Sequence, residues 1–119
     1  MITVDIQVLS GVSAGDTFRF RLSPGESIQI GRADTNNIVL SDPRVSRTHC
    51  GLLSRDGGLF IYDLGSAAGT VHMGFQLSSG QEGARPVADG DEFKIGDSLF
   101  RISTDANVVS VSEDTLSGH

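Results

Sequence analysis

Hydrophobic and polar residues alternate along several short stretches of this chain, with the period of two that is typical of β-strands. In the stretch TFRFRL at 17–22, for example, the apolar side chains fall on one face and the arginines on the other. Comparable stretches occupy 2–9, 27–31, 38–40, 49–53, 59–64, 70–73, 92–96 and 99–103. No stretch has the convincing spacing of an amphipathic helix. The pattern therefore predicts an all-β protein, a β-sandwich or a barrel, with about ten short strands.

Turn residues separate these stretches. The chain holds 15 glycines, about twice the usual share, which agrees with many tight turns. The longest stretch without alternation is 74–90, and we expect it to be irregular. Residues 104–119 are rich in Ser and Asp, and we predict that they form a flexible tail after an ordered domain at 1–103.

The size and composition suit a single globular domain, with 119 residues, 38% hydrophobic and 20% charged. No apolar stretch is long enough to span a membrane, and the opening residues lack the basic segment of a signal peptide. Cys50 is the single cysteine, so we expect a core residue without an internal disulfide, in a cytoplasmic protein. The net charge of −6 argues against nucleic acid as a partner.

Positive charge gathers in one part of this acidic chain. Four of the nine basic residues lie within 32–55, which holds two acidic residues. The four are Arg32, Arg44, Arg47 and Arg55. On charge alone, this excess is as consistent with an ordinary solvated face as with an anion-binding site.

Three small clusters lie between the predicted strands: Gly31-Arg32, the stretch SRTH at 46–49 and the stretch GSAAGT at 65–70. Loops at one end of a β-sandwich converge even when they are far apart in the sequence. Convergence would bring together guanidinium groups, a serine hydroxyl and backbone N–H groups that no large side chain covers. These donors suit a phosphate dianion, and nothing in the clusters supplies a base aimed at a nucleophile.

The clusters resemble the motifs of the forkhead-associated (FHA) domain, whose pattern is GR, SxxH and DLxSxNGT at similar spacings. Here the three motifs read GR at 31–32, SRTH at 46–49 and DLGSAAGT at 63–70. The resemblance extends to GVSAGDTF at 11–18 and DGDEFKIGD at 89–97, and so covers nearly all of the predicted domain. It implies a β-sandwich of about 11 short strands whose loops at one end bind phosphothreonine peptides.

The resemblance also implies roles for single residues. Arg32 is similar to the family's phosphopeptide-contacting arginine, and Ser46 to its phosphate-binding serine. Arg47 is similar to the basic residue often found beside that serine, and His49 to the structural histidine that braces the binding loops. Positions at which the family excludes a side chain are matched by Gly31 and Gly69.

The third motif departs from the family pattern at the predicted phosphopeptide-binding surface. Ala67 and Ala68 stand where the family has Thr, which can contact the phosphate, and Asn, which holds the peptide main chain. Alanine can form neither contact. Losing two or three neutral hydrogen bonds, each worth about 0.5–1.5 kcal/mol, would weaken binding roughly ten- to several-hundredfold. Met73 replaces a further family Asn that braces the loop.

The sequence thus predicts a phosphothreonine-dependent interaction module in signalling, whose partner is a protein phosphorylated by a Ser/Thr kinase. The alternative is an FHA fold with a decayed peptide site, which would assemble proteins independently of phosphate. An enzyme is least favoured, because the chain lacks both the P-loop lysine and the G-x-S-x-G elbow of hydrolases. No metal or other cofactor is expected, since His49, Cys50 and His72 lack metal-site spacing.

Overall fold

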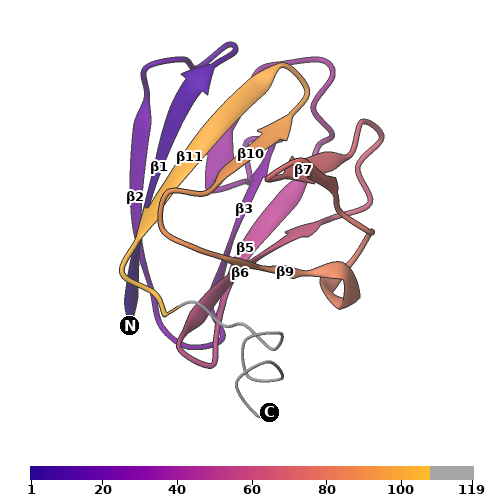
Figure 1. Ribbon diagram of the computed structural model, residues 1–119. Helices are drawn as coiled ribbons and strands as arrows, with labels where there is room; N and C mark the ends of the chain where they lie inside the picture. The colour runs from indigo at the N-terminus through magenta and orange to yellow at the C-terminus, as the bar shows by residue number, and fades with distance from the viewer. Residues whose placement is uncertain (108–119) are drawn as a thin grey trace.

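The computed structural model describes residues 1–107, which form two β-sheets packed face to face (Figure 1). The six-stranded sheet consists, in spatial order, of β2 (Thr17–Leu22), β1 (Ile2–Ser10), β11 (Ser98–Thr104), β10 (Glu92–Ile95), β7 (Thr70–His72) and β8 (Phe75–Gln76). The five-stranded sheet consists, in the same way, of β4 (Ile38–Val39), β3 (Ser27–Gly31), β5 (Cys50–Arg55), β6 (Gly58–Asp63) and β9 (Arg85–Val87). A short 3-10 helix, η1 (Gln81–Gly83), precedes β9. The predicted all-β sandwich is confirmed.

Alternating apolar residues build the core between the sheets. In β1, every second residue from Ile2 to Val8 is buried, while the residues between them are at least partly exposed. Phe93 of β10 and Phe100 of β11 stack with ring centroids 4.6 Å apart. Cys50 is fully buried in β5, as predicted. This packing fixes the strands, and with them the ends of the loops that the strands carry.

The strand boundaries follow the hydrophobic pattern closely. The predicted strands at 17–22 and 27–31 coincide with β2 and β3, and the other predicted strands end within two residues of observed ones. The expectation for 74–90 is wrong in part, because β8, η1 and β9 lie within it. Both residues of β8 are exposed, and β9 contains Pro86, so neither strand shows the alternation of a half-buried strand.

The described part of the chain remains bonded to the sandwich beyond residue 103. The hydroxyl of Thr104 donates to the carbonyl oxygen of Thr3 at 2.8 Å, and Asn107 N–H donates to the carbonyl oxygen of Gly57 at 3.1 Å. Most of the predicted tail, 108–119, lies outside the described residues. Within residues 1–107, no helix has the length and apolar character needed to cross a bilayer.

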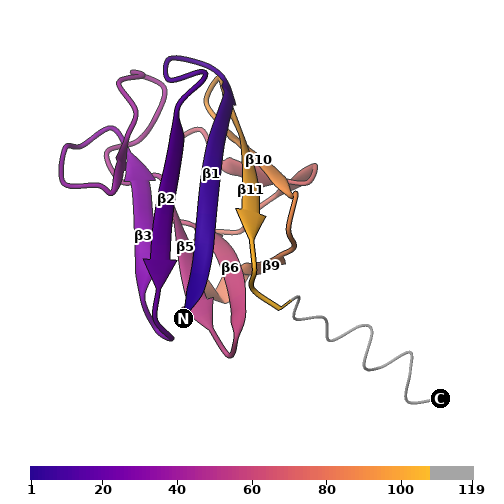
Figure 2. The ribbon, with the colours of Figure 1, turned by 90° about the vertical axis from the view of Figure 1, so that its left-hand side faces the viewer.

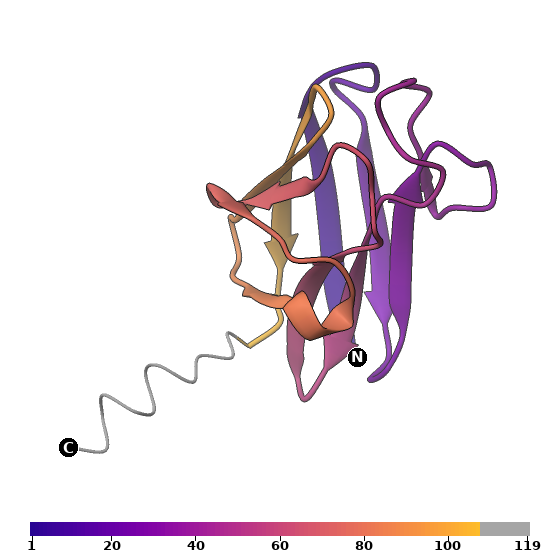
Figure 3. The same cartoon turned by 90° about the vertical axis from the view of Figure 1, so that its right-hand side faces the viewer.

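The three motif-bearing loops share one end of the sandwich. β3 and β6 are each antiparallel to β5, so both run toward the same end. The segment 32–49 leaves β3 there, and the segment 64–69 leaves β6. Figures 2 and 3 show both segments at the end opposite the N-terminus.

Candidate functional site

Arg32 follows directly after β3 and is held against the loop that precedes β5. Its backbone N–H donates to the carbonyl oxygen of Ser46 at 3.0 Å, and its side-chain Nε–H donates to the carbonyl oxygen of Val45 at 3.1 Å. These bonds direct the guanidinium group, whose other four N–H bonds lie on the terminal nitrogens. The side chain is exposed. It can therefore present its terminal N–H groups to an anion.

Ser46 joins the second motif to the third. Its Oγ accepts a hydrogen bond from Ala67 N–H at 3.0 Å. A hydroxyl oxygen that accepts one N–H still has its own proton to donate. The expected convergence of these two motifs is therefore present, and the Ser46 hydroxyl remains able to donate to a ligand.

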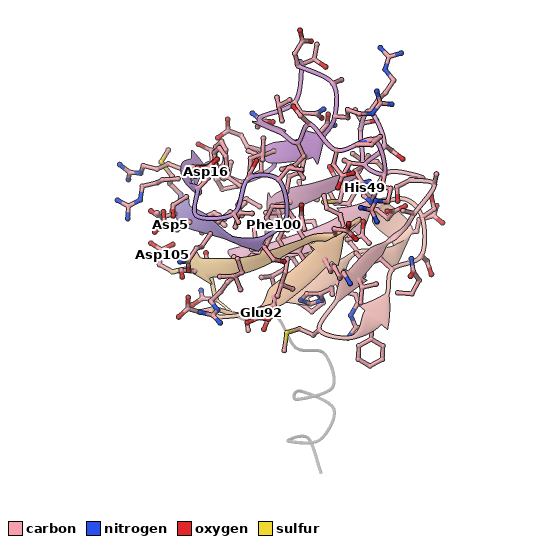
Figure 4. All side chains as sticks on the ribbon, turned by 90° about the horizontal axis from the view of Figure 1, so that it is seen from above. Asp5, Asp16, His49, Glu92, Phe100 and Asp105 are labelled. Atoms are coloured by element: carbon pink, nitrogen blue, oxygen red, sulfur yellow. The ribbon has the colours of Figure 1, made fainter. Side chains whose placement is uncertain are left out.

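His49 is fully buried beneath these loops (Figure 4). Its Nδ1 accepts a hydrogen bond from Ser46 N–H at 3.1 Å, so the ring proton is on Nε2. Nε2–H donates to the carbonyl oxygen of Gly69 at 2.8 Å. One imidazole ring thus ties the Ser46 segment to the loop at 64–69.

Gly31 ends β3 at a point where a second backbone passes very close. A Cβ here would collide with the carbonyl oxygen of Arg47 and would lie 2.9 Å from the side-chain nitrogen of Asn36. The Asn36 side-chain N–H donates to the Arg47 carbonyl oxygen at 2.7 Å and to the Ala33 carbonyl oxygen at 2.8 Å. The missing side chain therefore lets the Arg47 segment pack beside β3.

One buried carboxylate organises the small-residue loop. Asp63 ends β6, and its Oδ2 accepts hydrogen bonds from the N–H groups of Gly65 and Ser66, each at 2.9 Å. Its Oδ1 accepts from the hydroxyls of Ser66 at 2.6 Å and Thr70 at 2.7 Å. Ser66 Oγ in turn accepts from Gly69 N–H at 2.9 Å. These bonds fix the backbone whose Ala67 N–H reaches Ser46.

The surroundings of Asp63 shift two pKa values in opposite directions. Burial alone raises the pKa of the Asp63 carboxyl, but the hydrogen bonds that it accepts outweigh burial and hold the pKa below its usual value. Burial, followed by the nearby Asp63 charge, raises the pKa of the Cys50 thiol well above its usual value. Asp63 is therefore a charged loop organiser, and Cys50 is an unreactive thiol of the core.

The outer side of this loop borders a shallow depression. Its lining includes the exposed Ala67 and Ala68, together with Gln76 and Ser79. Neither alanine has a polar side-chain atom. A ligand here would meet backbone groups, the Gln76 carboxamide and the Ser79 hydroxyl.

Arg32 and Arg47 carry positive charge that no carboxylate of the described residues neutralises. Neither makes an ion pair within residues 1–107, and both are exposed. Arg44, in contrast, pairs with Asp97 and lies 3.8 Å from Asp42. Arg32 and Arg47, which flank Ser46, therefore contribute unpaired positive charge at this end.

The described residues offer no arrangement for a metal ion. Within residues 1–107, no three His, Cys, Asp or Glu side chains are grouped as ligands. The buried His72 Nε2 lies 2.9 Å from Asp91 Oδ2. His72 is thus hydrogen-bonded to Asp91, outside the loop site.

Comparison with known proteins agrees with this geometry. The family model described as FHA domain matches residues 28–96, more than half of the chain. The chain belongs to the FHA domain family. The FHA domain-containing protein At4g14490 of Arabidopsis thaliana is 31% identical over 100 residues, which are 82% of this chain and 25% of that protein. This FHA domain thus spans about a quarter of its curated relative.

Solved FHA domains have the same architecture. The solution structure of the FHA domain of an Arabidopsis thaliana hypothetical protein superposes with a TM-score of 0.77 and 26% identity, over 91% of this chain and 90% of that one. A structure from a structural and functional analysis of phosphothreonine-dependent FHA domain interactions gives a TM-score of 0.69 and 27% identity, over 85% and 95% of the chains. The resemblance seen in the motifs is confirmed.

Three residues that shape the site have no role predicted from the sequence. Asp63 and Asn36 organise the loops, and Gln76 lines the depression. The order Asp-x-Gly-Ser at 63–66 is a signal for Asp63, because an Asp side chain commonly accepts from N–H groups two or three residues later. Asn36 and Gln76 act across distances in the sequence that no local pattern reveals.

Proposed function

We propose that this FHA domain is a non-catalytic interaction module that binds phosphothreonine-containing peptides. The observation that carries the proposal is the Ser46 hydroxyl, which accepts the Ala67 N–H and keeps its own proton for a ligand. Arg32 lies beside Ser46. Its Nε–H is held by the Val45 carbonyl oxygen, and its terminal N–H groups can form forked, charge-assisted hydrogen bonds with a phosphate. Arg47 adds a second charge. A phosphate monoester matches this set of donors.

The relatives support the choice of ligand. The work on one of the compared FHA domains, 27% identical to this one, concerns phosphothreonine-dependent interactions. We infer the same chemistry here because hydrogen bonds hold Arg32 and Ser46 together at the loop end, where both can donate to a phosphate. The exposed Ala67 and Ala68 give less hold on the peptide main chain, so we expect moderate affinity.

We further infer that the partner is a protein phosphorylated by a Ser/Thr kinase and that the domain acts in cytoplasmic signalling. The buried thiol of Cys50, free of a disulfide, is compatible with a reducing compartment. The net charge of −6 disfavours nucleic acid and anionic membrane surfaces as partners.

The direct test is a binding comparison of Arg32→Ala, Ser46→Ala and the control Arg21→Ala. Arg21 is an exposed arginine of β2 for which no ion pair is recorded within residues 1–107. A phosphothreonine peptide selected on the wild-type domain should bind Arg32→Ala about 10- to 150-fold more weakly, since a charged hydrogen bond is worth about 1.5–3 kcal/mol. Arg21→Ala should bind like the wild type, and the bound peptide should keep its phosphate.

The second candidate is a scaffold that binds its partner independently of phosphate. The two exposed alanines favour it, because they remove side-chain contacts to a peptide. Its signature is a partner that binds equally well after phosphatase treatment and is insensitive to Arg32→Ala. That result would replace the phosphothreonine proposal.

A further inference from the structure

The depression beside the 65–69 loop contains one carboxamide in an unusual position. Gln76, on β8, is exposed, yet its side chain packs against Gly69. The place that a Cβ of residue 69 would take is occupied by the Gln76 side-chain nitrogen, with Cδ at 3.0 Å and Oε1 at 3.3 Å. Gly69, at φ +83°, is therefore the residue that lets this carboxamide reach the loop.

The backbone holds Gln76 at this place. Val71 of β7 pairs with Gln76 of β8, and Leu77 N–H donates to the carbonyl oxygen of Thr70 at 2.9 Å. Gln76 thus stands on the hairpin that follows directly after the loop. Strand pairing therefore fixes the backbone of Gln76, from which the carboxamide reaches Gly69.

The Gln76 carboxamide keeps its hydrogen-bonding capacity. No hydrogen bond of this side chain is recorded within residues 1–107, although it carries two N–H donors and one acceptor oxygen. A carboxamide has the same donor and acceptor groups as a peptide unit, so it can pair with the C=O and N–H of an extended chain. The adjacent Ala67 and Ala68 leave room for such a chain.

The loop connects this carboxamide to the phosphate site. The N–H of Ala67 donates to Ser46 Oγ, and the same residue lines the depression. Ser79 also lines the depression, with its Oγ 3.5 Å from the Cβ position of Gly65. A peptide with its phosphate at Ser46 can therefore continue over the loop into the depression.

We propose that Gln76 binds the main chain of the phosphopeptide in this depression and is a further peptide-binding residue of the site. The inference rests on the proposed phosphothreonine function. It predicts that part of the affinity comes from peptide residues beyond the phosphothreonine, held through their backbone rather than through their side chains.

The test compares Gln76→Ala with the control Gln81→Ala by fluorescence anisotropy. Gln81 is an exposed glutamine on η1 outside the depression. The probes are a long phosphothreonine peptide that binds the wild type and a capped phosphothreonine amino acid. Gln76→Ala should weaken binding of the long peptide about three- to tenfold, the size of one hydrogen bond. The capped amino acid should compete equally well for Gln76→Ala and for the wild type. Gln81→Ala should match the wild type with both probes.

Each failure has a distinct signature. If the wild type binds the long peptide and Gln76→Ala binds it equally well, the role of Gln76 is overturned and the phosphothreonine function stays intact. Equal weakening of the long peptide and the capped amino acid would also overturn it, because the effect would then act on the phosphate site. A wild type that binds no phosphopeptide would remove both proposals. Amide spectra of each variant check that the fold is kept.

Discussion

At the scale of single residues, Ala68 separates this domain most clearly from the motif of its family. The side chain is exposed at the rim of the depression and offers no hydrogen bond. We expect Ala68→Asn to strengthen binding of a phosphothreonine peptide about three- to tenfold, because it adds one or two hydrogen bonds to the peptide main chain. Titration calorimetry measures the change. Unchanged or weaker binding by the folded variant would show that the peptide does not pass over residue 68.

Asp63 is the residue on which the loop geometry depends. Asp63 is 4% exposed, and its carboxylate accepts four hydrogen bonds. Asp63→Asn replaces one acceptor oxygen with a donor group that faces N–H or O–H groups. We expect this change to lower the free energy of unfolding at pH 7 by about 1–3 kcal/mol, measured by urea denaturation.

The difference in the free energy of unfolding between the wild type and Asp63→Asn should depend on pH, with a defined sign. The pKa of Asp63 is lower in the folded protein than its ordinary value of about 3.9 in an unfolded chain. Its stabilising contribution is therefore complete above about pH 4 and is lost as the pH falls through the lower folded pKa. The difference between wild type and Asp63→Asn should shrink when unfolding is repeated near pH 3. A difference that stays constant from pH 7 to pH 3 would contradict the role given to the charge.

At the scale of elements, the β7–β8 hairpin carries a strained residue. Met73 and Gly74 form its turn with φ values of +50° and +85°, the signs of a type I′ turn, in which Asn-Gly is preferred. Methionine has no side-chain group that favours the left-handed region. We expect Met73→Asn to raise the free energy of unfolding by about 0.5–1 kcal/mol, with the melting temperature as readout. A less stable variant would mean that the Met73 contact with Glu92 N–H, at 3.3 Å, outweighs the turn preference.

Most elements could be predicted from the sequence because most strands bury one face. β2 and β3 coincide with their predicted ranges, since each alternates between an inner and an outer side. β8 could not be predicted, because both of its residues are exposed. β9 could not be predicted either, because its position depends on pairing with β6. Pairing partners outside the local sequence leave no periodic signal.

The candidate site was predictable to a similar degree. The motifs around Arg32 and Ser46 and the small-residue loop identify its parts, and the sandwich class places them at one end. The bond between Ala67 N–H and Ser46 Oγ and the contact of Gln76 with Gly69 depend on packing between distant segments. Such contacts require the three-dimensional structure.

At the scale of the whole molecule, the site is a small positive area on an acidic domain. The net charge is −6, whereas Arg32 and Arg47 have no carboxylate partner within residues 1–107. Binding of a phosphate dianion should therefore weaken about three- to tenfold between 0.05 and 0.5 M NaCl, because salt screens exposed charges. Anisotropy titrations at several salt concentrations should also show a smaller slope for Arg47→Ala. An identical slope would remove Arg47 from the site.

The central claim is that the phosphate of a threonine peptide binds between Arg32, Ser46 and the 65–69 loop. A two-dimensional NMR titration of the domain tests it, with a degenerate phosphothreonine peptide library and the unphosphorylated library as its pair. We expect the amide signals of Arg32, Ser46 and the 65–69 loop to shift only with the phosphorylated library. Unchanged signals at these residues, in a domain whose spectrum shows an intact fold, would contradict the claim and favour the phosphate-independent scaffold.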